Sequence, residues 1–241
     1  GDLGTSLYNN LPVMENILNS LEPTILIMIL SILISVVIGI PVGVISAVHR
    51  NSVLDYLLMT VSVFGLSIPV FWSGIMLAYY VGTLWGVLPN MYYYPISQVG
   101  LGQAIQYVIL PSVALGFQSV ASIARYTRST MLDTLGEDYI RTARAKGLAE
   151  RVVLYQHALK NAMSPVITHI GTNMASLMGG ACVIETVFGI NGMGKLAYDS
   201  LIRRDYTQVQ AIILVVALVY IVINLVVDIL YKVFDPRVEL S

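Results

Sequence analysis

The chain has 241 residues, of which 56% are hydrophobic and 11% charged, and its mean hydropathy is +0.77. Soluble domains carry about 25% charged residues, so this composition excludes an ordinary soluble protein and indicates a membrane protein. The formal net charge of −1 argues against a nucleic-acid partner, which would require a basic surface.

Long segments without charge predict the membrane-spanning helices. There are four such segments, and the second holds two apolar runs separated by the stretch GVLPNMYYYPISQVG. A spanning helix needs about 20 mainly apolar residues. These segments are apolar on all sides, whereas core helices of soluble proteins have a polar face. We therefore predict an all-α polytopic membrane protein. Its five predicted spans are about 25–48, 57–81, 104–127, 163–184 and 207–230.

The basic residues predict how the spans are oriented. Loops rich in Lys and Arg stay on the cytoplasmic side of a membrane. Ten of the 13 basic residues fall on one side of the five-span arrangement, six of them within residues 128–162. We therefore place this loop and the C-terminus in the cytoplasm, and the N-terminal segment 1–24 outside. A first residue outside also leads us to expect a missing N-terminal span, which would be the sixth.

One cytoplasmic stretch, EDYIRTARAKGLAERVVLYQHALK at residues 137–160, holds eight of the chain's 27 charged residues. We expect Asp133 or Thr134 to cap a helix whose first turn contains Glu137 and Asp138. Side-chain oxygens satisfy free N–H groups at a helix start, and the helix dipole favours negative charge there.

The same stretch contains signals for the end of this helix and for a second one. Arg144 and Lys146 would occupy the last turn, where the dipole favours positive charge. Gly147 suits the left-handed residue that ends a helix, and Leu148 suits the apolar contact that follows. Glu150 would open a second helix leading into the next span.

Two interpretations of this loop are possible. A solvated loop that only obeys the positive-inside rule would also be rich in basic residues. This loop, however, mixes apolar residues such as Tyr139 and Ile140 with its charges, as a docking surface does. We therefore favour a helix, glycine turn and helix that dock on a partner.

The run DYIRTARAKGL…HALKNAMSPVIT resembles the cytoplasmic EAA loop of permease subunits of ABC importers, in the oligopeptide, dipeptide and nickel branch. Arg141 and Thr142 replace the Glu and first Ala of the general pattern, as is usual in this branch, and the later Ile-x-Leu-Pro is not in register. The resemblance runs nearly end to end and is nearest to the B-type subunit. Other matching stretches are GDLGTS, GIPVGVISA, LSIPVFW, ETVFGINGMGKL, RRDYTQVQ and DPRVEL.

The resemblance implies a type I importer permease (MetI-like) fold in the inner or cytoplasmic membrane. The permease domain would cover 25–241, with a coupling loop at 137–161. The chain would form half of a pathway for di- or oligopeptides, with nickel or another metal chelate as the alternative substrate. Implied partners are a second, C-type permease subunit, two cytosolic ATPase subunits, an extracytoplasmic substrate-binding protein and membrane lipid. ATP and magnesium would bind the ATPase subunits, and we expect no cofactor, catalytic or metal site in this chain.

The residues expected to contact the ATPase subunits all lie in the coupling loop. They are Tyr139, Arg141, Ala143, Arg144, Lys146, Gly147, Leu148 and Glu150. His169 and Asn173 share one face of their span and are candidates for the substrate pathway. For His169, a hydrogen bond between helices is an equally good explanation.

Residues 189–195, GINGMGK, match the first seven positions of a phosphate-binding loop, but the eighth lacks the hydroxyl that would hold magnesium. The predicted extracytoplasmic location also argues against an ATP site. The stretch is then a glycine-rich turn, or a docking turn for the substrate-binding protein that uses Gly192, Gly194 and Lys195. Glu185 and Asp228 lie near span ends, so we expect them to be exposed at the membrane interfaces.

Gly39 and Gly43 have the spacing that lets two membrane helices pack closely, and a flexible gate is the alternative. Pro41 and Pro69 are expected to kink their helices.

Two other classes of protein fit the sequence less well. An ion channel or carrier would carry charge in its central spans, and a membrane enzyme would bring His, Asp or Glu together at membrane depth. The sequence shows neither pattern.

Overall fold

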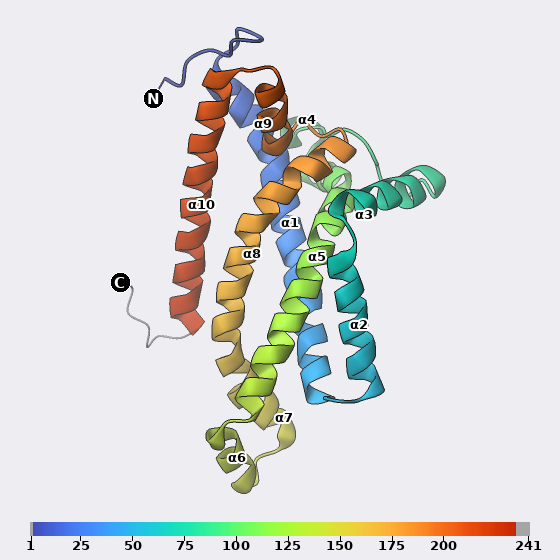
Figure 1. Ribbon diagram of the computed structural model, residues 1–241, viewed down its shortest axis with the longest axis vertical. Coiled ribbons are helices and arrows are strands. Elements are labelled where there is room, and N and C mark those ends of the chain that lie inside the picture. The colour runs from blue at the N-terminus through green and yellow to red at the C-terminus, as the bar shows by residue number, and fades with distance from the viewer. Residues whose placement is uncertain (1, 235–241) are drawn as a thin grey trace. The chain divides into compact units, whose positions relative to one another are not determined.

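The computed structural model describes residues 2–234 (Figure 1). Regular structure in these residues is helical, apart from one isolated bridge between Thr5 and Pro12. The helices are α1 (Val13–Val48), α2 (Val53–Ser67), α3 (Val70–Leu77), η1 (Ala78–Leu84), α4 (Ile96–Val99), α5 (Leu101–Leu135), α6 (Asp138–Ala145), α7 (Glu150–Val152), η2 (Val153–Leu159), α8 (Lys160–Val187), α9 (Met193–Ile202) and α10 (Tyr206–Phe234).

The chain divides into two compact units. The first comprises residues up to 32, 68–116 and 174–222, and the second comprises 33–67, 117–173 and the residues from 223 onward. The boundaries fall inside the four longest helices, α1, α5, α8 and α10, and near the end of α2.

The predicted number of spans is not confirmed. Within the described residues, three helices are long and apolar enough to cross a membrane: α1, α5 and residues Tyr206–Val226 of α10. Segments Val53–Ser67 and Val70–Leu84 meet the same criterion only when they are taken together as one interrupted span. The predicted span 163–184 lies inside α8, where only Ser176–Val187 forms a shorter apolar helix. The described residues therefore contain three or four candidate spans, which does not confirm the prediction of five.

The two predicted proline kinks have different outcomes. Helix α1 continues without interruption past Pro41. At Pro69, by contrast, the chain has extended backbone angles (φ −61°, ψ 137°), and α3 begins only at the next residue. Proline lacks an N–H group and disfavours a helical residue before it, so the helix is broken rather than kinked here. The predicted span 57–81 is therefore not one continuous helix.

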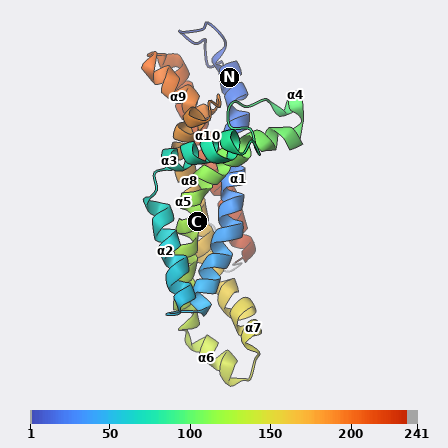
Figure 2. The same ribbon diagram turned by 90° about the vertical axis from the view of Figure 1, so that its right-hand side faces the viewer.

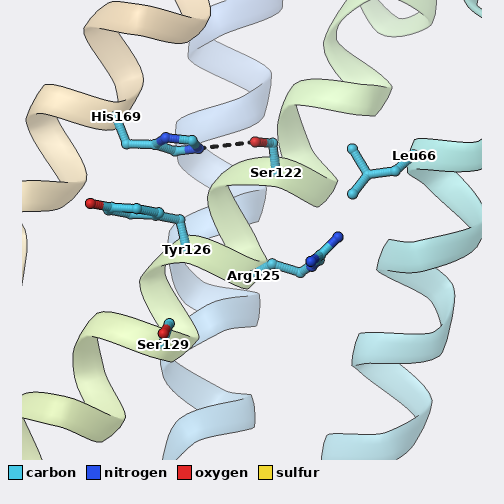
Figure 3. A pocket seen from close by; sticks show the side chains of 6 residues that line it. All are labelled: Leu66, Ser122, Arg125, Tyr126, Ser129 and His169. Carbon is cyan, nitrogen blue, oxygen red and sulfur yellow. Dashed lines mark hydrogen bonds between the residues drawn. The ribbon is translucent and has the colours of Figure 1, made fainter.

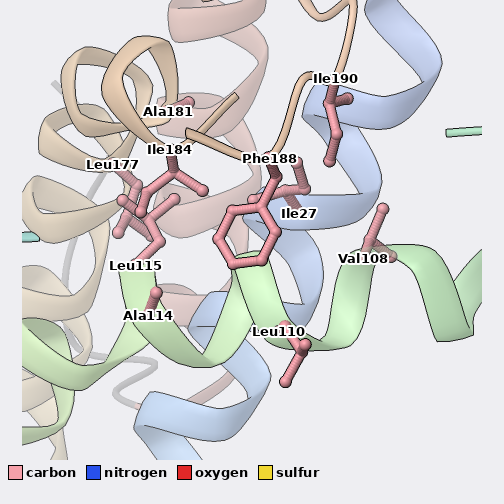
Figure 4. Packing of buried hydrophobic residues seen from close by; sticks show 10 residues of the cluster. All are labelled: Ile27, Val108, Leu110, Ala114, Leu115, Leu177, Ala181, Ile184, Phe188 and Ile190. Carbon is pink, nitrogen blue, oxygen red and sulfur yellow. The ribbon is translucent and has the colours of Figure 1, made fainter. Parts of the chain in front are cut away.

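The core of the first unit is a cluster of buried apolar side chains from α1, α5, α8 and the turn after α8 (Figure 4). The Phe188 ring, which is 1% exposed, points into this cluster. Inside a membrane such contacts stabilise a protein by close packing, because lipid is as apolar as the side chains themselves. The members are Ile27, Val108, Leu110, Ala114, Leu115, Leu177, Ala181, Ile184, Phe188 and Ile190.

The second unit has its own buried cluster, which joins the coupling-loop helices to the ends of α1, α5 and α8. It comprises Val44, Ala47, Met131, Ile140, Ala143, Val153, Ala158 and Ala162. Helix α1 packs closely on α5 just before the α1 residues of this cluster. A Cβ atom on Gly43 would lie 2.5 Å from the Ala124 carbonyl oxygen, and one on Gly39 would lie 3.0 Å from the Val120 carbonyl oxygen. The prediction that these glycines permit close helix packing is confirmed.

An ion pair fixes the turn between α1 and α2 against α5 in the second unit. The Asp55 side chain is 1% exposed and accepts two hydrogen bonds of 2.7 Å from the Arg128 guanidinium. It also accepts the Asn51 N–H at 3.0 Å and the Ser46 hydroxyl. A buried carboxylate is stable only when its oxygens are satisfied in this way. This ion pair was not predicted from the sequence.

Candidate functional site

The first helix of the coupling loop starts later than predicted. Helix α5 runs through Leu135, so Asp133 and Thr134 lie inside its last turn and cap nothing. The Thr134 hydroxyl instead donates to the Thr130 carbonyl at 2.8 Å. Glu137, expected in the first turn, is the cap residue of α6 and makes no side-chain capping bond. These predictions were wrong because they assumed that the helix of the predicted span 104–127 ends near residue 127, whereas α5 continues to Leu135.

The end of α6 confirms the prediction for Gly147. Its φ is +75°, which is the left-handed conformation. The Gly147 N–H donates to the Arg144 carbonyl at 2.9 Å, and the Leu148 N–H donates to the Ala143 carbonyl at 3.4 Å. This pair of bonds is the Schellman motif, which satisfies carbonyls that a helix end leaves free. No atom of the described chain lies within 4 Å of a Cβ placed on Gly147, so the backbone angle alone requires glycine.

A salt bridge links the two helices across this turn. The Arg144 guanidinium donates to the Glu150 carboxylate at 2.7 and 3.2 Å, and α7 begins at Glu150 as predicted. The hydrogen bond from Arg144 lowers the pKa of Glu150 and in turn raises the pKa of Arg144. Both side chains are about half exposed (43% and 55%), so solvent screens the attraction. Such a bridge contributes about 0–1 kcal/mol.

Helix α6 has one face buried in the chain and one face exposed. Ile140 is fully buried and Ala143 is 7% exposed, and both pack in the second unit's cluster. The Tyr139 hydroxyl accepts a 2.9 Å hydrogen bond from Asn161 of α8, which fixes the orientation of α6. Figure 2 shows that α6 and α7 lie beyond the ends of α1 and α2.

The exposed face of the coupling loop contains all but one of the residues that the sequence assigned to ATPase contact. They are Tyr139, Arg141, Arg144, Lys146, Gly147, Leu148 and Glu150. Ala143 is the exception, because it supports α6 from within. Leu148 does not make the apolar contact expected after a helix end, since it is 41% exposed and lies outside the buried cluster. This face therefore exposes aromatic, aliphatic, cationic and anionic groups.

A polar pocket of about 320 Å³ lies in the second unit on one face of α5 (Figure 3). Its lining residues are Leu66 of α2, Ser122, Arg125, Tyr126 and Ser129 of α5, and His169 of α8. His169 Nε2 lies 2.9 Å from the Ser122 hydroxyl, and its ring stacks on Tyr126 with 4.2 Å between ring centroids. The hydrogen bond between helices that the sequence allowed for His169 is therefore present, and His169 also lines the pocket.

The second residue proposed for the pathway, Asn173, does not line this pocket. Its side-chain amide donates to the His169 carbonyl at 2.9 Å, within α8. Arg125, which also lines the pocket, was not among the predicted site residues. A signal was available, because Ser122, Arg125 and Ser129 repeat at intervals of three and four residues. This spacing places polar side chains on one face of a helix that is otherwise mainly apolar.

The glycine-rich turn after α8 is built around a carboxylate of the chain itself. Glu185 was expected to be exposed, but its relative exposure is 0%. Its carboxylate accepts the Lys195 N–H at 2.8 Å and the Thr24 hydroxyl at 2.5 Å, and that hydroxyl accepts the Met193 N–H at 2.8 Å. The expectation failed because the turn folds back over the end of α8 and supplies the donors. The side chain of Asp228 lies outside the described residues.

Close contacts explain the two glycines proposed for docking in this turn. A Cβ on Gly192 would lie 2.2 Å from the Glu185 carboxylate, and one on Gly194 would lie 2.5 Å from the Cys182 Cα. Backbone N–H groups of this turn bind Glu185, so the phosphate-loop match has a structural explanation. Lys195 is partly exposed, and its ammonium donates to the Asn191 side chain at 2.9 Å.

Comparison with known proteins places the chain in a family. The family model described as binding-protein-dependent transport system inner membrane component matches residues 39–240. The dipeptide transport system permease protein DppB of Alkalihalophilus pseudofirmus is 42% identical, over 99% of this chain and 78% of that protein. The oligopeptide transport system permease protein AppB of Bacillus subtilis is 42% identical, over 99% and 76%. The glutathione transport system permease protein GsiC of Escherichia coli is 42% identical, over 99% and 75%.

Solved structures share the fold. One inward-facing structure of the MetNI methionine ABC transporter aligns with a TM-score of 0.73 and 19% identity, covering 92% of this chain and 97% of that one. A chain of an amino acid ABC transporter solved with histidines aligns with a TM-score of 0.59 and 16% identity, covering 93% and 95%. The predicted type I importer permease fold is thus confirmed, and the nickel alternative finds no support in the names of these relatives. The chain belongs to the family of binding-protein-dependent transport system inner membrane components, the permease subunits of ABC importers.

Proposed function

We propose that the chain forms half of a pathway that imports di- or oligopeptides across the cytoplasmic membrane. Three relatives are named for dipeptide, oligopeptide and glutathione transport, and glutathione is itself a short peptide. A second permease subunit would complete the pathway, and a substrate-binding protein would deliver peptides to the outer segments 82–103 and 185–206. ATP and magnesium would bind two cytosolic ATPase subunits rather than this chain.

The observation that supports energy coupling is the two-faced character of α6. Ile140 and Ala143 tie the inner face to the ends of α1, α5 and α8 through one buried cluster. The outer face, with Tyr139 and Arg141, is left for a partner. A partner that grips the outer face can move the long helices without first unfolding the loop. ATP would favour one of two states of the transporter by binding it more tightly.

The chemistry of the exposed face suits a protein partner. Tyr and Arg are enriched among the residues that dominate binding energy at interfaces. In our proposal the loop and the C-terminus are cytoplasmic, where ATP is available. The last residues of the C-terminus, 235–241, lie outside the described part of the chain.

The test is a co-purification of the tagged full-length protein from its native membrane. One variant carries Tyr139→Ala, Arg141→Ala and Leu148→Ala on the exposed face. A matched control carries Arg50→Ala and Tyr56→Ala, which remove an exposed cation and an exposed aromatic ring outside the loop. We expect wild type and control to capture ATPase subunits with ATP hydrolysis, and the loop variant to lose both. Absence of ATPase subunits from the wild type, or their full retention by the loop variant, would refute the proposal.

A further inference from the structure

We propose that the pocket around Arg125 binds the terminal carboxylate of a peptide as it passes through the transporter. The inference rests on the proposed function and adds a substrate contact to it. Arg125 is an exposed residue that extends from α5 toward α2 and lines the pocket (Figure 3). No acidic side chain of the described residues pairs with it. Arg128, three residues further on, is by contrast neutralised by Asp55.

The position of this charge restricts what it can face. Arg125 lies in α5, in the predicted span 104–127 and near its cytoplasmic end. An arginine in a membrane helix is costly against lipid, so it almost always faces a water-filled cavity or a polar partner. The pocket provides such a cavity, because Ser122, Ser129 and His169 share it. Arg125 is therefore suited to face a substrate pathway.

The groups in the pocket select an anion with a planar pair of oxygens. A guanidinium offers two parallel N–H groups that match a carboxylate. The Ser129 hydroxyl lies one helical turn away on the same face and can add a further donor. With Asp55 and Arg128 paired outside the pocket, Arg125 leaves the lining with a positive charge. A neutral or cationic ligand would leave that charge unpaired.

The walls and size of the pocket fit the end of a peptide. Leu66 forms an apolar wall, and the stacked rings of Tyr126 and His169 form a flat one. Ligand pockets range from about 300 to 1,000 Å³, so the volume of about 320 Å³ suits one or two residues. Every linear peptide ends in a carboxylate whatever its side chains are. A site that binds only this terminal carboxylate would accept peptides of many sequences.

The strength of the contact also suits transport. A pathway site must bind strongly enough to admit its substrate and weakly enough to release it. One arginine in an open pocket meets this requirement better than a closed cage of donors would. We expect replacement of Arg125 to weaken carboxylate binding about tenfold, which corresponds to about 1.4 kcal/mol.

The experiment measures peptide binding to the complete complex in phosphatidylcholine nanodiscs, without nucleotide or substrate-binding protein. Equilibrium dialysis compares radiolabelled dialanine with its C-terminal amide, which differs only in lacking the carboxylate. The test variants are Arg125→Gln and Arg125→Lys, and the control is Arg50→Gln, which removes an exposed guanidinium outside the pocket. We expect wild type and control to bind dialanine about tenfold more tightly than its amide. Arg125→Gln should lose this preference, while its affinity for the amide stays unchanged. Arg125→Lys should retain part of the preference, because it keeps the charge but not the planar fork.

Four results would overturn the inference. They are an acid preference that survives in Arg125→Gln, no saturable binding of dialanine to wild type, loss of the second permease subunit from Arg125→Gln, and loss of dialanine binding when phosphatidylglycerol is added. The third result would mean that Arg125 pairs with an acidic side chain of that subunit. The fourth would mean that it binds a lipid phosphate. ATPase co-purification from the same membranes separates the two proposals. If ATPase subunits co-purify but Arg125→Gln still prefers dialanine over its amide, the carboxylate site is refuted and the proposed transport function is not.

Discussion

Replacing Gly147 should uncouple ATP hydrolysis from transport in graded steps. Gly147 has a φ of +75°, and no described atom lies within 4 Å of a Cβ at this position. The cost of a side chain is therefore that of the left-handed backbone alone, which for L residues is about 1–2 kcal/mol. We expect about 1 kcal/mol for Gly147→Ala, about 2 kcal/mol for the β-branched Gly147→Val, and less for Gly147→Asn, because Asn tolerates this conformation.

The assay is peptide uptake per ATP hydrolysed by the reconstituted transporter, normalised to the amount of protein inserted. Costs of about 1–2 kcal/mol correspond to losses of roughly 5- to 30-fold if coupling requires this turn. The matched control is Gly102→Ala, since a Cβ there also meets open space but the backbone is helical. Alanine is favourable in a helix, so the control should be neutral or slightly stabilising. Equal uptake per ATP in Gly147→Val and wild type would refute the reasoning, as would an asparagine variant worse than the valine variant.

Three further predictions concern contacts in the two units. Asp55→Asn should lower the stability of the purified complex by about 3 kcal/mol, because it leaves Arg128 unpaired in a largely buried site. The double variant Asp55→Asn/Arg128→Gln removes that unpaired charge, so it should melt at a higher temperature than Asp55→Asn. Gly192→Ala should sharply reduce the folded yield, since its Cβ would lie 2.2 Å from a buried carboxylate, and a normal yield would contradict this geometry. The pKa of Glu150 is lowered in the fold, so its bridge to Arg144 should stabilise the loop above the ordinary value of 4.5 and fade as pH falls through the lowered one. The hydrogen-exchange protection factors of the loop, which are corrected for the intrinsic exchange rate at each pH, should therefore fall in acid or in 1 M salt, by an amount worth at most about 1 kcal/mol.

Short-range signals in the sequence predicted the glycine turn of the coupling loop and the start of its second helix, but not the start of its first helix. Gly147 ends α6 because a left-handed residue satisfies nearby carbonyls, and Glu150 begins α7 because charge near a helix end acts within one turn. The family and the all-helical fold could be inferred for a similar reason. Apolar runs and motif spacing are properties of neighbouring residues, and they do not depend on how the chain packs.

Contacts between distant residues decided the rest. Glu185 is buried because Thr24, 161 positions earlier, donates to it, and Arg128 is neutralised by Asp55, 73 positions earlier. Arg125 and Arg128 lie three residues apart on α5, but their surroundings differ. Asp55 of α2 pairs with Arg128, whereas Arg125 lines a pocket. Apolar runs and local helix signals indicate which segments are helical. The helix partners across the bundle determine which buried polar groups are satisfied and which are left for a ligand.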